Sequence, residues 1–179
     1  QMAESAGTVL MFSNIGQRNI RAMLTGTTIA IFLISALLMI ALRSLKIGLI
    51  SLVANLVPAG IGFGLWGIFV GQVGLSLSIV TGMTFGIVID DSVHFLSKYL
   101  RARREKQLGV DDSVRYSFNT VGKALVVTTF ILVVGFSVLA TSSFLVNSAM
   151  GTMTAIIISI ALVTTFLLLP PLLIQTEGK

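Results

Sequence analysis

The sequence contains no cysteine and a single histidine, His94. Without cysteine, disulfide bonds, thiolate metal sites and cysteine nucleophiles are all excluded. One histidine beside only seven acidic residues leaves little material for a metal site. We therefore expect no metal, no cofactor and no enzymatic activity.

Charge is also scarce: 11% of the 179 residues are charged, whereas 55% are hydrophobic. The mean hydropathy of +0.99 is too high for a soluble domain of this size, which has no room to bury so much apolar surface. The bilayer must therefore be the solvent. The first 20 residues lack the charged start and short apolar core of a signal peptide.

The net charge of +5 does not indicate nucleic-acid binding, because of where the basic residues lie. Ten of the twelve Lys and Arg residues fall around 43–46, within 98–123 and at the C-terminus, and the other two precede the first apolar run. Basic residues confined to alternate connections are typical of a membrane protein with a positive-inside topology.

Five apolar runs are each long enough to cross roughly 30 Å of hydrocarbon as a helix. Strands are excluded because membrane-spanning strands are shorter and alternate in polarity. The predicted fold is an all-α membrane domain over residues 22–179, a bundle of five transmembrane helices at about 22–42, 47–70, 75–99, 121–143 and 149–174. Three small-residue pairs fit close helix packing: Gly60 and Gly64, Gly67 and Gly71, Gly82 and Gly86.

The connections between the runs predict the topology. The first and third carry basic residues, and the second and fourth carry no charge. The first and third connections and the C-terminus are therefore expected in the cytoplasm, and the N-terminus outside. Residues 1–21 are predicted to be a periplasmic tail, the end of something larger, because five spans are unusual for a complete protein.

A short amphipathic helix is predicted at about 110–120, in the third connection. Asp111 and Asp112 suit a helix start, and Val110, Val114 and Phe118 recur at helical spacing. We expect this helix to lie on the inner membrane surface before the fourth span.

Asp90 and Asp91 lie inside the third apolar run, LSLSIVTGMTFGIVIDDSVHFLSKY. Ionised carboxylates are costly in hydrocarbon, so membrane proteins that contain them usually use them for protons, ions or substrate. Two nearby carboxylates in a low dielectric also raise each other's affinity for protons. The pair is therefore a candidate proton relay.

The same depth in the next, antiparallel helix holds Thr128 and Thr129. We expect these hydroxyls to face the carboxylates, although two neighbouring helix residues point about 100° apart and cannot both face one partner. His94 follows Asp90 by four residues, and either extends a proton path towards the cytoplasm or only bonds its neighbour. A purely structural role, with Asp91 paired to Lys98 or His94, stays open.

Several segments together resemble the resistance-nodulation-division (RND) permeases, and within them the MMPL-like branch, which is related to sterol-sensing-domain proteins. They are GIVIDDSVHFLSKYLRARREK, the span KALVVTTFILVVGFSVLATSSF with its Gly135 and Phe136, and the closing LLLPPLLI. The resemblance runs from about Gln17 to Ile174. One departure is that Asp91 follows Asp90 where many MMPL-like members have an Asp-Tyr pair.

The resemblance implies an exporter of hydrophobic or lipidic molecules in the bacterial inner membrane, driven by the proton gradient. Such exporters have two similar six-span halves with large periplasmic domains, so the implied partners are the first half, those domains, membrane lipid and the substrate. A homo-oligomer or a periplasmic partner protein is also possible in this family. Asp90 and Asp91 take the proton-coupling position in the tenth span.

Two other functions compete with the exporter. A non-transporting sterol or lipid sensor of the same fold, with a structural aspartate pair, stays open. An intramembrane aspartyl protease needs two aspartates from different spans, whereas only one span here contains Asp. That function is excluded.

Overall fold

The structure is a computed structural model that describes residues 22, 25–40, 42–69 and 75–178. The predicted periplasmic tail, 1–21, lies outside these residues. Helices account for almost all of the described chain, interrupted by short connections at 43–44, 105–109 and 141–144, and no strand occurs in this part. The all-α class is therefore confirmed.

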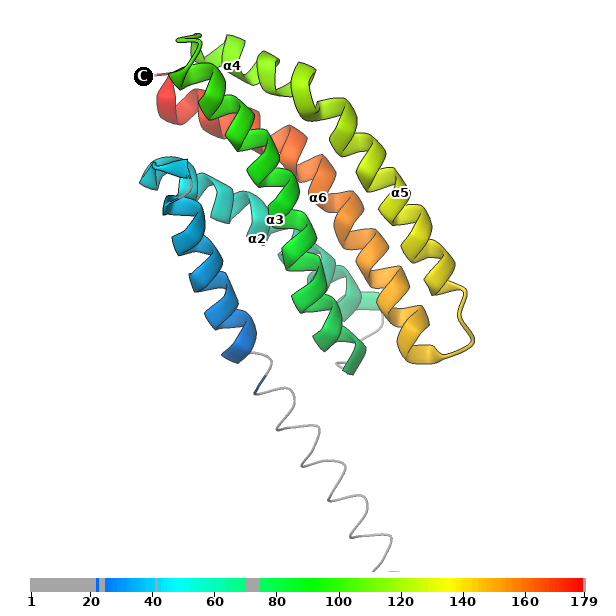
Figure 1. Ribbon diagram of the computed structural model, residues 1–179. Coiled ribbons are helices and arrows are strands. Elements are labelled where there is room, and N and C mark those ends of the chain that lie inside the picture. The colour runs from blue at the N-terminus through cyan, green and yellow to red at the C-terminus, as the bar shows by residue number, and fades with distance from the viewer. Residues whose placement is uncertain (1–21, 23–24, 41, 70–74, 179) are drawn as a thin grey trace, which may run out of the picture.

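Figure 1 shows the helices in chain order as a bundle. They are an unlabelled first helix, Thr25–Ile40, followed by α2 (Leu45–Phe69), α3 (Leu75–Arg104), α4 (Val110–Ser117), the π-helical turn η1 (Phe118–Gly122), α5 (Lys123–Ala140) and α6 (Leu145–Glu177). Each predicted run thus coincides with a helix. The basic residues after the third run extend α3 to Arg104, because cations favour the C-terminal end of a helix.

Three helices of the described chain are long and apolar enough to cross a membrane: Leu45–Ile68, Val110–Ala140 and Leu145–Glu177. Over the residues that the structure describes without a gap, Thr25–Ile40 is a shorter apolar helix. The remaining helix, α3, contains the aspartate pair and a basic end. The protein is a membrane protein, while the count of five spans stays a prediction.

The amphipathic helix differs from the prediction. It begins at Val110 as expected, but it does not end as a separate helix, because η1 joins α4 to α5 without a break. Val114 is buried against the ends of α3 and α6, with Val110 and Phe118 packed beside it. The apolar face of α4 therefore packs on protein, and its position on the membrane surface stays a prediction; Figure 1 shows the arch that α4 and α5 form at the top of the bundle.

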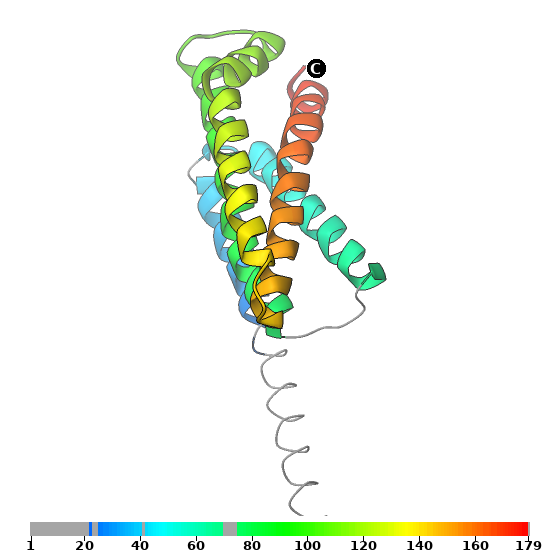
Figure 2. The ribbon, with the colours of Figure 1, turned by 90° about the vertical axis from the view of Figure 1, so that its right-hand side faces the viewer.

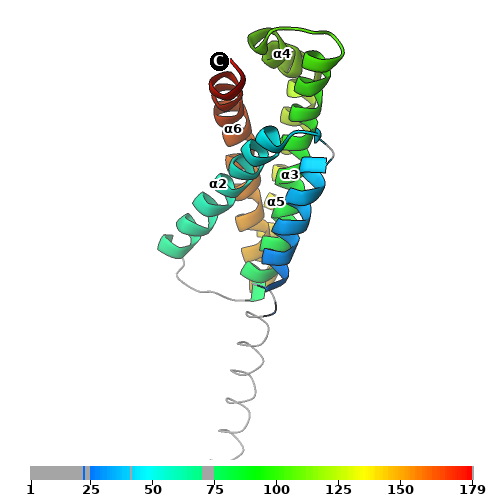
Figure 3. The same ribbon diagram turned by 90° about the vertical axis from the view of Figure 1, so that its left-hand side faces the viewer.

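The last helix, α6, is the centre of the bundle, because α2, α3, α4 and α5 all pack against it. Figures 2 and 3 show α2 crossing the other helices at an angle. In the described part of the chain, α3 and α5 both lie on α6 but make little direct contact with each other. This arrangement leaves a gap in the packing between α3 and α5.

Close helix contacts occur at glycines other than those predicted. The first member of each predicted pair, Gly60, Gly67 and Gly82, has open space where a side chain would stand. A Cβ atom on Gly151 would instead lie 2.5 Å from the backbone nitrogen of Ala140, so α5 and α6 touch there. The small-residue pattern is too common in membrane helices to identify which glycine meets a neighbour.

Candidate functional site: a groove between α3 and α5

A groove of about 460 Å³ lies between α3 and α5. Asp90, Asp91 and His94 line it from α3, and Thr128 lines it from α5. The rest of its wall is apolar, formed by alanine, valine, leucine and isoleucine side chains. Four of the five predicted site residues therefore meet at one cavity.

The two carboxylates lie in different surroundings. Asp91 is buried, with 8% of its surface exposed, whereas 71% of the Asp90 side chain is exposed. This difference follows from the 100° between successive side chains of a helix. Both carboxylates nevertheless line the one groove opposite α5, although to different depths.

His94 approaches Asp90 rather than Asp91. Its Nε2 atom lies 3.5 Å from the Asp90 Oδ1 atom, one helical turn earlier. Within the described chain, Asp91 forms no salt bridge with Lys98 or His94. The pairing on which the purely structural interpretation depended is therefore not present for Asp91.

The two threonines, Thr128 and Thr129, lie in different surroundings. Thr128 lines the groove, but its hydroxyl donates to carbonyls of its own helix, 3.0 Å from Ala124 O and 3.1 Å from Leu125 O. Thr129 is buried outside the groove, and its hydroxyl has no hydrogen-bond partner among the described residues. Neither hydroxyl bonds a carboxylate in this structure, so their supporting role stays a prediction.

Three aromatic rings pack together one helical turn after Asp91. Phe95 follows Asp91 by one turn and meets the Phe118 ring edge-on at 5.1 Å, and Phe118 meets Phe166 in the same way at 5.1 Å. The rings come from α3, η1 and α6. Spacing along the sequence does not show that these three rings meet.

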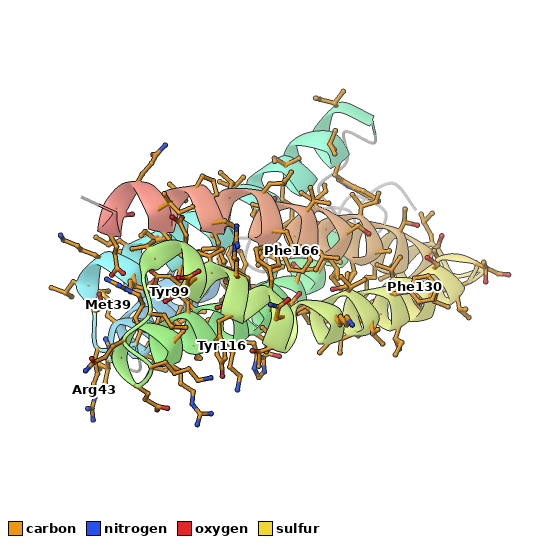
Figure 4. All side chains as sticks on the ribbon, turned by 90° about the horizontal axis from the view of Figure 1, so that it is seen from above. Met39, Arg43, Tyr99, Tyr116, Phe130 and Phe166 are labelled. Carbon is orange, nitrogen blue, oxygen red and sulfur yellow. The ribbon has the colours of Figure 1, made fainter. Side chains whose placement is uncertain are left out.

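Polar contacts join the helix ends near the C-terminus of the chain. The Tyr99 hydroxyl donates to the Glu177 carboxylate at 2.7 Å, and Arg103 Nε lies 3.5 Å from the same oxygen. Arg104 donates to the Leu42 carbonyl at 2.7 Å, just before the connection that leads into α2. Figure 4 shows Tyr99 among the helices and Arg43 at the periphery.

One polar contact beside the site was not predicted. Ser92, next to Asp91, donates to Asn55 on α2 at 2.6 Å. Counting residues from the ends of the spans places Asn55 at the depth of the aspartates, but only the packing shows its partner.

The MMPL family model matches residues 2–179. The chain belongs to the MMPL family. A comparison with curated proteins finds no match. Membership of this family, together with the apolar helices, makes the chain an RND/MMPL-type membrane protein with a transporter-related function. Within the described residues no group of three or more His, Cys, Asp or Glu residues comes together as a metal site.

Proposed function

We propose that this chain is the transmembrane part of an exporter of hydrophobic or lipidic molecules that is driven by the proton gradient, with Asp90 and Asp91 as its proton relay. One observation supports the proposal above all: two carboxylates and an imidazole line one mostly apolar groove. Ionisable groups gathered at membrane depth are typical of proton pathways.

The groove suits the movement of a proton. Both carboxylates repel each other when ionised, and binding one proton removes that repulsion. Asp91 is enclosed and Asp90 is open, so a proton passing between them crosses from an exposed to a buried position. His94, in contact with Asp90, extends the path towards the cytoplasmic end of α3.

The exposure of Asp90 indicates that a further part of the transporter covers this side chain. A carboxylate on the outer wall of a membrane helix is not stable against acyl chains. We propose that another six-span half of the transporter covers the groove, and that periplasmic domains select the substrate. We propose that the protein lies in the inner membrane, with its N-terminus in the periplasm and its C-terminus in the cytoplasm.

The test compares Asp90→Asn and Asp91→Asn in the full-length transporter with Asp111→Asn and Asp112→Asn, which remove exposed carboxylates from α4. Proton-driven export should fall at least about 100-fold in the first two variants, as expected for a lost acid–base group. The α4 variants should transport normally. Expression and monodispersity in detergent serve as the folding control.

A sterol or lipid sensor of the same fold is the competing function. Unaltered activity in both groove variants would support the sensor and reject the relay.

A further inference from the structure

A chain of buried polar side chains joins α3 to α2 beside the groove. The Ser92 hydroxyl donates to Asn55 Oδ1 at 2.6 Å, and Asn55 Nδ2 donates to Ser51 Oγ at 3.4 Å. All three residues are almost fully buried, with no more than 2% of their surface exposed. A buried interhelical hydrogen bond in an apolar environment specifies how two helices are oriented.

The hydroxyl of Ser92 has a different kind of hydrogen-bond acceptor from other hydroxyls of these helices. Ser35, Thr84, Ser117 and Ser159 each donate to the carbonyl oxygen four residues earlier in the same helix. That local bond is the usual choice for serine and threonine inside a helix. Ser92 instead bonds a residue 37 positions away, on another helix. Its hydroxyl therefore serves the contact between α2 and α3.

Asp91 is the neighbour of Ser92, and their side chains point about 100° apart. Ser92 faces α2 while Asp91 lines the groove opposite α5. We propose that the Ser92–Asn55 hydrogen bond fixes the rotation of α3 about its axis and thereby holds Asp91 in the groove. Ser92 and Asn55 are positioning residues for the relay, and this inference rests on the proposed function.

No fixed charge faces Asp91 from the neighbouring helices. Among the residues that the structure describes, the only other ionisable groups that line the groove, Asp90 and His94, belong to α3 itself. The single charged residues of α2, α5 and α6 are Lys46, Lys123 and Glu177, which stand at helix ends. The surroundings of Asp91 therefore depend on how α3 is turned.

The experiment uses the full-length transporter in membranes and a hydrophobic carbodiimide, which couples to protonated carboxyl groups in apolar sites. Fragment mass spectrometry reports Asp90 and Asp91 separately. In Ser92→Ala, labelling of Asp91 should slow about threefold or more, the factor that a typical interhelical hydrogen bond supplies. Labelling of Asp90 in the same sample should change less.

Three variants complete the design. Ser92→Thr keeps the hydroxyl and should restore the native labelling rate. Asn55→Leu removes the acceptor from α2 without altering α3 and should slow Asp91 labelling as Ser92→Ala does. Thr84→Val is the matched control, because it removes a buried hydroxyl of α3 that bonds only within α3.

Native Asp91 labelling in folded Ser92→Ala would overturn the proposal, as would equal slowing at Asp90 and Asp91. Failure of both Ser92→Ala and Asn55→Leu to fold would also overturn it, since the bond would then be a requirement of the fold. The labelling rate does not depend on export. Slowed labelling beside normal export by Asp91→Asn would therefore reject the proton relay and leave the positioning role standing.

Discussion

The two faces of α3 differ sharply. The closed face, formed by Ser92, Phe95, Leu96 and Tyr99, is fully buried against α2, η1 and α6. The open face, formed by Asp90 and His94, borders the groove, with 71% and 59% of the two side chains exposed. Asp91 lies between the two faces and is buried while still lining the groove.

One helix thus combines a tightly packed face with a face of exposed ionisable groups. Dense packing and paired polar groups on the closed face fix α3 in place. The open face keeps ionisable groups where a proton or a partner helix reaches them. The following predictions test whether stability depends on close packing and function on the open face.

The largest effect on stability is expected where α5 and α6 are in contact. Gly151→Ala should lower the free energy of unfolding by about 1–3 kcal/mol, because the new methyl group meets the backbone of Ala140 and Phe136. Gly135 is on the open side of α5, where an added Cβ atom has no neighbour within 4 Å. Gly135→Ala should therefore raise the free energy of unfolding by up to about 1 kcal/mol through helix propensity. Reversible denaturation in mixed micelles measures the free energy of unfolding of both variants. A change of the same sign in the two variants would contradict the prediction.

Filling the groove should reduce function rather than stability. Ala124 lines the groove, so Ala124→Phe should lower export about tenfold, which corresponds to about 1.4 kcal/mol, by obstructing the carboxylates. Val127→Phe adds a ring to an exposed position of the same helix that does not line the groove. Export assays should separate the two variants, and the same loss in both would remove the groove from the mechanism.

A smaller loss of stability is expected at Tyr99, on the closed face near the C-terminal end of α3. Tyr99→Phe removes the hydroxyl that bonds Glu177 and should cost about 1 kcal/mol of stability, the usual value for a buried hydrogen bond. The Lys106 Nζ atom lies 4.1 Å from the centroid of the Tyr116 ring. Tyr116→Phe keeps this ring and should lower stability less than Tyr99→Phe does. Thermal denaturation followed by the fluorescence of Trp66 compares them. A larger loss in Tyr116→Phe would reverse the expected order.

The smallest effect is expected at an exposed ion pair. The hydrogen bond and charge of Glu105 raise the pKa of Arg101, but both side chains are more than half exposed. Pairs of this kind contribute little to stability because solvent screens them. Arg101→Gln should therefore leave the Tm unchanged, and a fall of several degrees would show that this pair matters to the fold.

Hydrophobic runs predicted the positions of the helices well, because each run had to be apolar to enter the membrane. The fusion of α4 with α5 was missed, since the shift of hydrogen bonding in η1 has no signature in composition. At the site, helical spacing predicted the meeting of Asp90 and His94. The partners of Thr128, Thr129 and Ser92 depend on how helices turn against one another, which sequence spacing does not determine.

The central claim is that a groove carboxylate changes its protonation as the transporter works. Infrared difference spectroscopy of the full-length protein, titrated across pH, measures this directly through the C=O stretching band of a protonated carboxyl group. We predict a titrating band that is present in the native protein and in Asp111→Asn and is lost in Asp91→Asn. A spectrum that is the same in Asp91→Asn as in the native protein would contradict the account.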